Sequence, residues 1–169
     1  MTPSATKFSF AVVADEATRV LILGSLPGEA SLRQGEYYAH RRNQFWRLME
    51  GVTERDLVGL PYADRLATLL LAGVGLWDVI HSAERVGSLD ADIRRATANG
   101  LTTLVAALPS LRAIGFNGVT ASVIGRRQLG VDPGPDLLTL PSSSPARAIP
   151  FEHKQAAWRK MNPYLGAPR

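Results

Sequence analysis

The sequence contains no cysteine among its 169 residues. Disulfide bonds, thiolate catalysis, cysteine-ligated zinc and iron–sulfur clusters are therefore excluded as sources of stability or chemistry. Histidine is scarce too, and His40, His81 and His153 are too isolated to show the spacing of metal ligands. We expect neither a metal ion nor another cofactor.

Long hydrophobic runs are also missing. The longest apolar stretches, such as LATLLLAGVGLW, fall short of the roughly 20 residues that span a bilayer. The N-terminal MTPSATKF lacks a long apolar signal core. Hydrophobic residues make up 46% and charged residues 20% of the chain, which is close to the average for soluble globular proteins. We expect a cytoplasmic monomer that does not interact with membranes.

The excess of positive charge is modest. The chain has 19 Lys and Arg against 15 Asp and Glu, a formal net charge of +4. Most of the positive residues are arginine, whose planar guanidinium group binds phosphate well. An arginine-rich genome would produce the same excess, so charge alone does not establish a nucleic-acid partner.

Four short apolar runs, each bounded by Gly, Pro or polar residues, have the composition of buried strands. They cover residues 19–23, 74–80, 111–116 and 136–140. Helical periodicity is found at residues 43–51, 62–72, 91–108, 118–127 and 151–164. This alternation predicts an α/β fold, a three-layer α/β/α single domain over residues 1–169 with a central, mostly parallel four-stranded sheet.

The loops that follow the strands of such a sheet meet at its carboxyl edge, where ligands bind. We expect the loops after residues 23, 80, 116 and 140 to converge there. The first, GSLPGEASL, does not resemble the helix that usually follows a parallel strand. Gly24 and Gly28 make its backbone N–H groups approachable, and Pro27 fixes the turn. It can hold an anion or a base edge, but a plain strand-ending turn has the same pattern, and the lysine of a Walker loop is absent.

The continuation YYAHRRNQFW places aromatic residues around His40, two arginines and Asn43. Aromatic faces such as that of Tyr38 stack on bases, and arginine holds phosphate. The alternative is structural: Phe45 and Trp46 begin an amphipathic helix and point into the core.

Three consecutive serines, Ser142, Ser143 and Ser144, follow the last strand in the segment LPSSSPAR. Short hydroxyls suit phosphate contacts, and a tip stiffened by Pro145 next to Arg147 suits insertion into a groove. An ordinary serine-rich turn before a helix is the alternative.

Together these segments resemble a known family. GSLPGEASL, YYAHRRNQFW, LWDVIHSAERVGSLDADI, IGFNG and LPSSSPAR with a closing KQAAW helix follow one another in the order found in the uracil-DNA glycosylase superfamily. The similarity is to its hypoxanthine-DNA (deoxyinosine) glycosylase-like branch and extends from about Val20 to Trp158. The resemblance implies a metal-free DNA repair enzyme that flips a deaminated base, uracil or hypoxanthine, out of double- or single-stranded DNA. It would then hydrolyse the N-glycosidic bond and leave an abasic site.

The resemblance also implies roles for individual residues. In this branch an important asparagine stands at Asn43, and an aromatic residue that stacks on the extruded base stands at Phe45. Asp78 lies where related enzymes have an asparagine that reads the base edge. Leu26 replaces the water-activating Asp or Asn of many members, and Leu140 replaces the histidine of the best-known uracil glycosylases.

The chemistry of the reaction suggests how these residues would act. Cleavage creates a cation-like sugar and an anionic base, so base extrusion, anion stabilisation and a placed water matter more than a strong base. The carbonyl of Asn43 can orient water toward C1′. Backbone N–H groups of Gly24 and Ser25 can bind a base oxygen, and His40 is an alternative donor or acid, or else a surface or capping residue. Asp78 can accept an N–H of the base, activate water itself, or merely pair with an arginine.

Two other classes of function are compatible with these residues. An α/β enzyme or binding module that uses GSLPG for a nucleotide phosphate explains the first loop, but leaves YYAHRRNQF and LPSSSPAR unrelated. A noncatalytic DNA-binding protein explains the basic loops but gives Asn43 no role.

Overall fold

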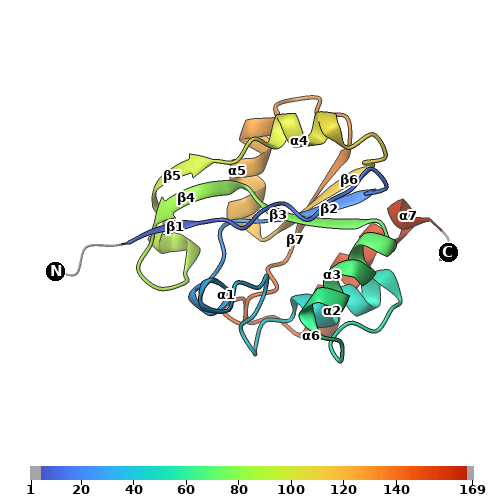
Figure 1. The fold of residues 1–169 in the computed structure, drawn as a ribbon, viewed down its shortest axis with the longest axis horizontal. Coiled ribbons are helices and arrows are strands. Elements are labelled where there is room, and N and C mark those ends of the chain that lie inside the picture. Colours follow the sequence, from blue (N-terminus) through green and yellow to red (C-terminus); the bar gives the residue numbers. More distant parts are fainter. Residues whose placement is uncertain (1–4, 167–169) are drawn as a thin grey trace.

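The computed structural model describes residues 5–166, so the ends of the expected 1–169 domain lie outside the described residues. Four parallel strands form its central sheet in the order β3-β2-β6-β7 (Figure 1). The strands are β2 (Val20–Gly24), β3 (Val74–Asp78), β6 (Ala113–Asn117) and β7 (Asp136–Leu140). The three-layer α/β fold with a parallel four-stranded sheet is confirmed. The expected and observed ends of the four strands differ by no more than two residues.

Helices cover both faces of this sheet, and β2 is therefore buried on both sides. Its residues alternate, with Val20 and Ile22 in one hydrophobic core and Leu21 and Leu23 in the other. Figure 1 shows α4 (Leu101–Ala107) and α5 (Val119–Leu129) on one face. On the other face lie α2 (Phe45–Thr53), α3 (Tyr62–Leu71), α6 (Phe151–Trp158), the 3-10 turn η2 (Arg159–Met161) and α7 (Asn162–Leu165).

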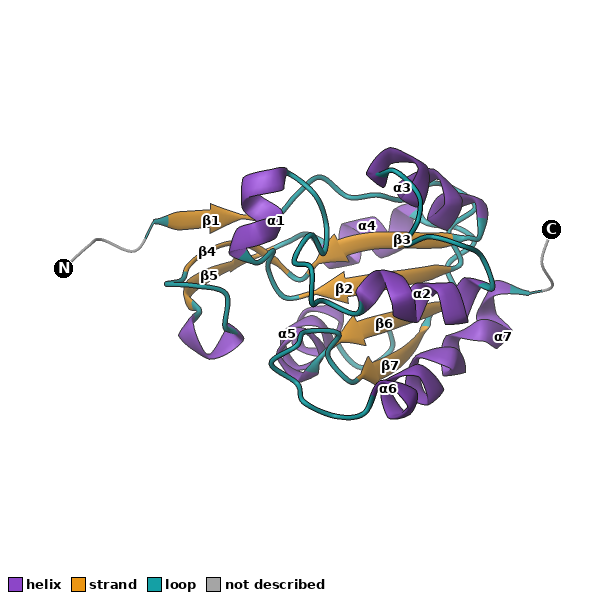
Figure 2. Ribbon diagram, turned by 90° about the horizontal axis from the view of Figure 1, so that it is seen from below, coloured by secondary structure: helices purple, strands orange, loops and turns teal. Residues whose placement is uncertain are grey.

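A second, antiparallel sheet was not expected from the sequence. It has the order β1-β4-β5 and comprises β1 (Thr6–Phe8), β4 (Ile80–Glu84) and β5 (Arg94–Ala98). The expected strand at 74–80 divides at Val79, whose N–H donates to Gly24 O at 2.8 Å, and the chain then leaves the central sheet. Figure 2 shows this small sheet extending from one end of the molecule.

The prediction of a helix over residues 91–108 was therefore wrong in its first half. This segment contains a 3-10 turn, η1 (Asp90–Asp92), then β5, and only then α4. All residues of β5 are exposed, so no alternation of hydrophobic residues marks the strand. Backbone pairing with β4 creates it, with support from the Asn99 amide, which donates to Asp78 O at 2.8 Å and Ile80 O at 3.1 Å.

The connection after β2 does contain a helix, contrary to expectation. The helix α1 (Glu29–Gln34) has only six residues and ends at Gly35 in the left-handed conformation, with φ 67°. The chain then returns through two consecutive tyrosines to the start of α2. Among residues 5–166, no helix is long and apolar enough to cross a membrane.

Candidate active site

A cavity of about 510 Å³ lies at the carboxyl edge of the central sheet. It is lined by residues 24–31, 37, 38, 40, 43, 78, 88–90, 117 and 142–147. The loops that follow the four parallel strands therefore converge, as predicted, although the second contributes through Asp78 and the returning segment 88–90. All predicted site residues except Phe45 line this cavity.

Asp78, the last residue of β3, is the most unusual group in the cavity. It is only 3% exposed, and its Oδ2 is buried without a hydrogen-bond partner among the described residues. Burial raises the pKa of Asp78 to about 7, with Arg85 opposing and Asp90 reinforcing the shift. No described residue forms an ion pair with Asp78. A buried carboxyl with an unused oxygen is costly, so its place in a cavity indicates a role in binding a ligand.

Gly24 is required by this arrangement. A Cβ atom at position 24 would lie 2.6 Å from Asp78 Oδ1 and 3.1 Å from the Tyr38 hydroxyl. The first distance is shorter than real Cβ contacts, so a side chain at position 24 would have to displace the Asp78 carboxyl. A glycine at the end of β2 thus allows the carboxyl and phenol groups to meet over the backbone.

The aromatic residues form a stack in which Tyr38 and Phe45 have different positions. Their rings are 3.8 Å apart between centroids and inclined by 17°, and Phe45 is completely buried. Tyr38 lines the cavity and has an unusual positive φ of 55°. Burial and the nearby Asp78 raise the pKa of Tyr38, so its hydroxyl stays protonated. Phe45 lies behind Tyr38, so the expected direct contact between Phe45 and a base does not fit this geometry.

Asn43 and His40 lie side by side in a turn at the cavity wall. Asn43 N–H donates to His40 O at 2.9 Å, and Asn43 Oδ1 accepts the N–H of Phe45 at 2.9 Å. Asn43 thereby orients the first turn of α2, while its carbonyl oxygen keeps a second lone pair. His40 is exposed, and its Nδ1 accepts the Arg42 N–H at 3.1 Å, which gives it a role in shaping the loop.

Ser25 reaches a residue that sequence reasoning missed. Its hydroxyl donates to Asp90 Oδ1 at 2.6 Å, and both residues line the cavity. Asp90 belongs to the β4–β5 connection, which was expected to be near the start of a helix. The only sequence signal was the paired acids of the DAD segment, which resemble an ordinary solvated turn.

The serine loop, residues 142–147, is tied to the end of β6 by Asn117. Asn117 Nδ2 donates to Ser143 Oγ at 2.9 Å, and Ser143 N–H donates back to Asn117 Oδ1 at 2.8 Å. Ser143 is 1% exposed. The expected contact between the Ser143 hydroxyl and DNA phosphate does not fit this burial, and its role is to fix the loop. Asn117 was also missed as a site residue, although it stands in the IGFNG segment directly after a predicted strand.

The rest of the serine loop is accessible. Ser142 and Ser144 are half-buried and connected by the Ser144 N–H, which donates to Ser142 Oγ at 3.1 Å. Arg147 is exposed at the tip. Lys154 of α6 is 1% exposed and donates to Ser144 O at 3.2 Å. It supports the loop from below.

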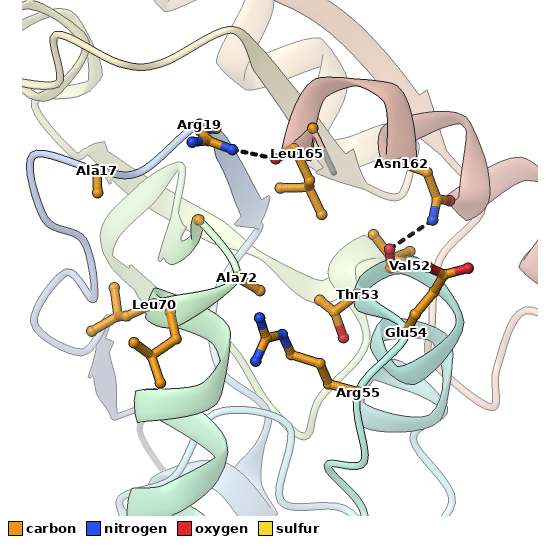
Figure 3. Close-up of a pocket in the computed structure, with 13 residues that line it drawn as sticks. Ala17, Arg19, Val52, Thr53, Glu54, Arg55, Leu70, Ala72, Asn162 and Leu165 are labelled. Carbon is orange, nitrogen blue, oxygen red and sulfur yellow. Dashed lines mark hydrogen bonds between the residues drawn. The ribbon is translucent and has the colours of Figure 1, made fainter. Parts of the chain in front are cut away.

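A second, smaller cavity of about 230 Å³ lies at the opposite, amino edge of the sheet (Figure 3). It is bordered by the ends of α2, α3 and α7. The side chains of Arg19 and Asn162 donate hydrogen bonds to the backbone carbonyls of Leu165 and Val52, respectively. These contacts join helix ends to the sheet, and no residue of this cavity has the buried carboxyl chemistry of the larger one.

The comparisons with known proteins agree on one family. The profile of the uracil DNA glycosylase superfamily matches residues 10–166. The chain is 37% identical over 152 residues to a protein of Methanosarcina acetivorans named hypoxanthine DNA glycosylase, covering 90% of this chain and 95% of that protein. A hypoxanthine DNA glycosylase of Methanosarcina barkeri is 41% identical over 112 residues, or 66% of this chain and 71% of the relative. The solution NMR structure of a candidate uracil DNA glycosylase from M. acetivorans superposes with a TM-score of 0.84 at 34% identity, covering 96% of this chain and all of that one.

Proposed function

Because the chain belongs to the uracil DNA glycosylase superfamily, and so to a family of DNA repair glycosylases, we propose that it excises deaminated bases from DNA. Its substrates are hypoxanthine and uracil. The enzyme hydrolyses the N-glycosidic bond of the extruded nucleotide and leaves an abasic site. The observation that carries this proposal is the buried, unpartnered oxygen of Asp78 inside the cavity. The names of the two Methanosarcina relatives support hypoxanthine as a substrate in addition to uracil.

Asp78 discriminates between deaminated bases and the normal bases from which they form. Deamination converts a ring nitrogen that accepts a hydrogen bond into an N–H donor, at N1 of hypoxanthine and N3 of uracil. An ionised Asp78 accepts that N–H. Adenine N1 and cytosine N3 present a lone pair to the same oxygen, and leaving buried polar groups unpaired rejects such bases strongly. The carboxylate thus selects for the product of deamination.

Tyr38 is the surface on which the extruded base stacks. Its ring lines the cavity, and Phe45 supports it from behind at 3.8 Å. Base–aromatic stacking contributes about 1–3 kcal/mol. This arrangement gives the two aromatic residues separate roles, with Tyr38 contacting the base and Phe45 holding Tyr38 in position.

Asn43 orients the attacking water, and the loop after β2 stabilises the departing base. When the C1′–N bond breaks, its electron pair leaves with the base, and the water oxygen bonds to C1′. Backbone N–H groups at Gly24 and Ser25 stabilise the negative charge that grows on the base oxygen. His40, exposed at the cavity wall, is an auxiliary donor to the same region.

The DNA itself is held by the rim of the cavity. Ser142 and Ser144 contact phosphates beside the extruded nucleotide, while Pro145 and Arg147 enter the minor groove near the gap that it leaves. Because phosphate contacts release counterions, affinity falls as salt rises. The enzyme acts as a monomer.

A cleavage assay tests the proposal. End-labelled duplexes that contain one uracil, one hypoxanthine or only normal bases are incubated with the purified protein in EDTA, and alkali then cleaves abasic sites. We expect strand breaks with the first two substrates and none with the third. An inactive protein on both modified duplexes, or activity that requires an added divalent ion, would contradict the proposal.

A further inference from the structure

The tip of the β4–β5 hairpin, residues 85–93, is fastened to the loop that follows β2. The Ser25 hydroxyl donates to Asp90 Oδ1, and three further bonds hold the base of the tip. These are Glu29 N–H to Ser88 Oγ (3.0 Å), Lys7 Nζ to Gly87 O (2.6 Å) and Arg85 Nε to Gly87 O (3.0 Å). The tip therefore presents Asp90 to the cavity from a fixed position.

Arg85 strengthens this attachment from inside. It is 1% exposed, and its guanidinium group also donates to the carbonyl of Pro27 in the loop after β2. The charges of Asp90, Glu29 and Asp78 act on this buried arginine. A buried cation between two segments, with several carboxylates nearby, holds the hairpin tip and the GSLPG segment as one unit.

Asp90 and Asp78 lie at different depths in the cavity. Asp78 is 3% exposed at the bottom, whereas Asp90 is half-buried on the wall, and the two are close enough for the charge of Asp90 to act on Asp78. A nucleotide whose base reaches Asp78 must keep its sugar closer to the mouth, since the sugar remains joined to the DNA backbone. Asp90 is therefore the carboxylate nearer to the sugar.

The third position of the loop after β2 is not acidic, because Leu26 stands there and is 6% exposed. Asn43 can orient water, but an amide cannot accept its proton. The amide of Asn43 and the backbone N–H groups therefore leave the positive charge of the sugar unbalanced. Of the acidic residues that line the cavity, Asp78 is committed to the base and Glu29 is exposed on α1.

We propose that Asp90 is a catalytic residue that stabilises the cation-like deoxyribose and accepts the proton of the attacking water, an inference that rests on the proposed glycosylase function. The C1′–N bond breaks with its electron pair going to the base, and the oxygen of the water held by Asn43 forms the new bond to C1′. The water's proton passes to the Asp90 carboxylate and then to solvent, and the released base takes a proton from solvent. No other reactant is needed.

The experiment separates the charge of Asp90 from its hydrogen bond. Single-turnover cleavage at saturating uracil- or hypoxanthine-containing duplex is measured for Asp90→Asn, Ser25→Ala and Asp92→Asn, together with DNA affinity and melting temperature. Asp90→Asn keeps an oxygen for the Ser25 hydroxyl but removes the charge. Ser25→Ala removes the hydrogen bond but keeps the charge. Asp92 is exposed on the same turn outside the cavity, and its variant is the matched control.

We expect Asp90→Asn to lower the single-turnover rate by about one hundredfold or more, with DNA affinity unchanged or higher. Ser25→Ala should cost less than about tenfold, and Asp92→Asn should behave as the wild type. A folded Asp90→Asn variant with a near-normal rate, or equal losses in Asp90→Asn and Ser25→Ala, would overturn the catalytic role. Asp90→Ala is measured in parallel, and if Asp90→Asn does not fold, a folded Asp90→Ala with a near-normal rate overturns it equally. Wild-type protein that cleaves neither duplex contradicts the proposed function itself, which is a distinct result.

Discussion

The two cavities at opposite edges of the central sheet each contain one buried oxygen without a hydrogen-bond partner among residues 5–166. At the carboxyl edge it is Asp78 Oδ2, and at the amino edge it is Asn162 Oδ1. The amide of Asn162 is neutral, and its nitrogen already donates a hydrogen bond to Val52 O. The carboxyl of Asp78 is ionisable and has its pKa raised by burial.

We infer from this difference that the carboxyl-edge cavity binds a ligand, whereas the amino-edge cavity is structural. An unpaired neutral oxygen costs a small amount of stability, which a solvent molecule can restore. An unpaired carboxylate costs much more, and a fold keeps it where a ligand supplies the missing donor. The comparison therefore predicts that substitutions at the carboxyl edge alter catalysis, whereas those at the amino edge alter only stability.

The largest effects are expected from Asn43→Ala and Asp78→Ala. Loss of the water-orienting amide should lower single-turnover cleavage by about one hundredfold or more, with DNA affinity nearly intact. Asp78→Ala should weaken discrimination between deaminated and parent bases. If Asn43→Ala keeps a near-normal rate while Asp78→Ala is inactive, Asp78 and not Asn43 positions the water.

Tyr38→Ala should come next. Removal of the stacking surface should weaken retention of the extruded base by about 1–3 kcal/mol, which appears as a lower kcat/KM with a smaller change in melting temperature. Phe45→Leu, inside the core, should show the reverse pattern. The assignment of the two rings would be wrong if Phe45→Leu were the more damaging to kcat/KM.

Asp78→Asn tests the cost of the buried carboxyl as a function of pH. The raised pKa means that the folded protein binds more protons than the unfolded chain between the ordinary carboxyl pKa and about 7. Stability therefore falls as pH rises through this window. Asn removes the penalty, so the variant should melt higher than the wild type at pH 8, with the advantage shrinking toward pH 4. Thermal denaturation across this range gives the answer, and a pH-independent difference would refute the cause.

A smaller effect is expected from Arg147→Ala at the tip of the serine loop. DNA affinity should fall for modified and normal duplexes alike, and the slope of log affinity against log salt should decrease by about 1. Single-turnover cleavage at saturation should change less. Arg127→Ala, an exposed arginine near the C-terminal end of α5, is the matched control. Equal slopes for the two variants would place Arg147 outside the DNA interface.

The smallest effect belongs to the amino-edge cavity. Asn162→Ala removes the hydrogen bond to Val52 O and should lower the free energy of unfolding by about 1 kcal/mol. Cleavage per folded molecule should equal that of the wild type. A loss of catalysis in this variant would mean that the two edges of the sheet are coupled, and the comparison between them would no longer hold.

The sequence by itself determined the central sheet, since runs such as residues 19–23 are apolar on both faces and only a covered parallel strand buries them so fully. It also determined the family, because five segments in one order carry more information than any of them alone. The convergence of the strand-following loops, and with it the placement of Asn43, Asp78 and the serine loop around one cavity, followed from that topology.

Only the tertiary structure decided how these groups are arranged around the cavity. The exposed strand β5 and the Asp90 that precedes it depend on backbone pairing with β4, which leaves no periodic pattern of hydrophobic residues. The position of Phe45 behind Tyr38 depends on a positive φ and a ring stack, and the burial of Ser143 depends on a partner 26 residues earlier in the chain. The periodicity of hydrophobic residues shows which face of an element is buried. It does not show which distant residues that element contacts, and these contacts are of that kind.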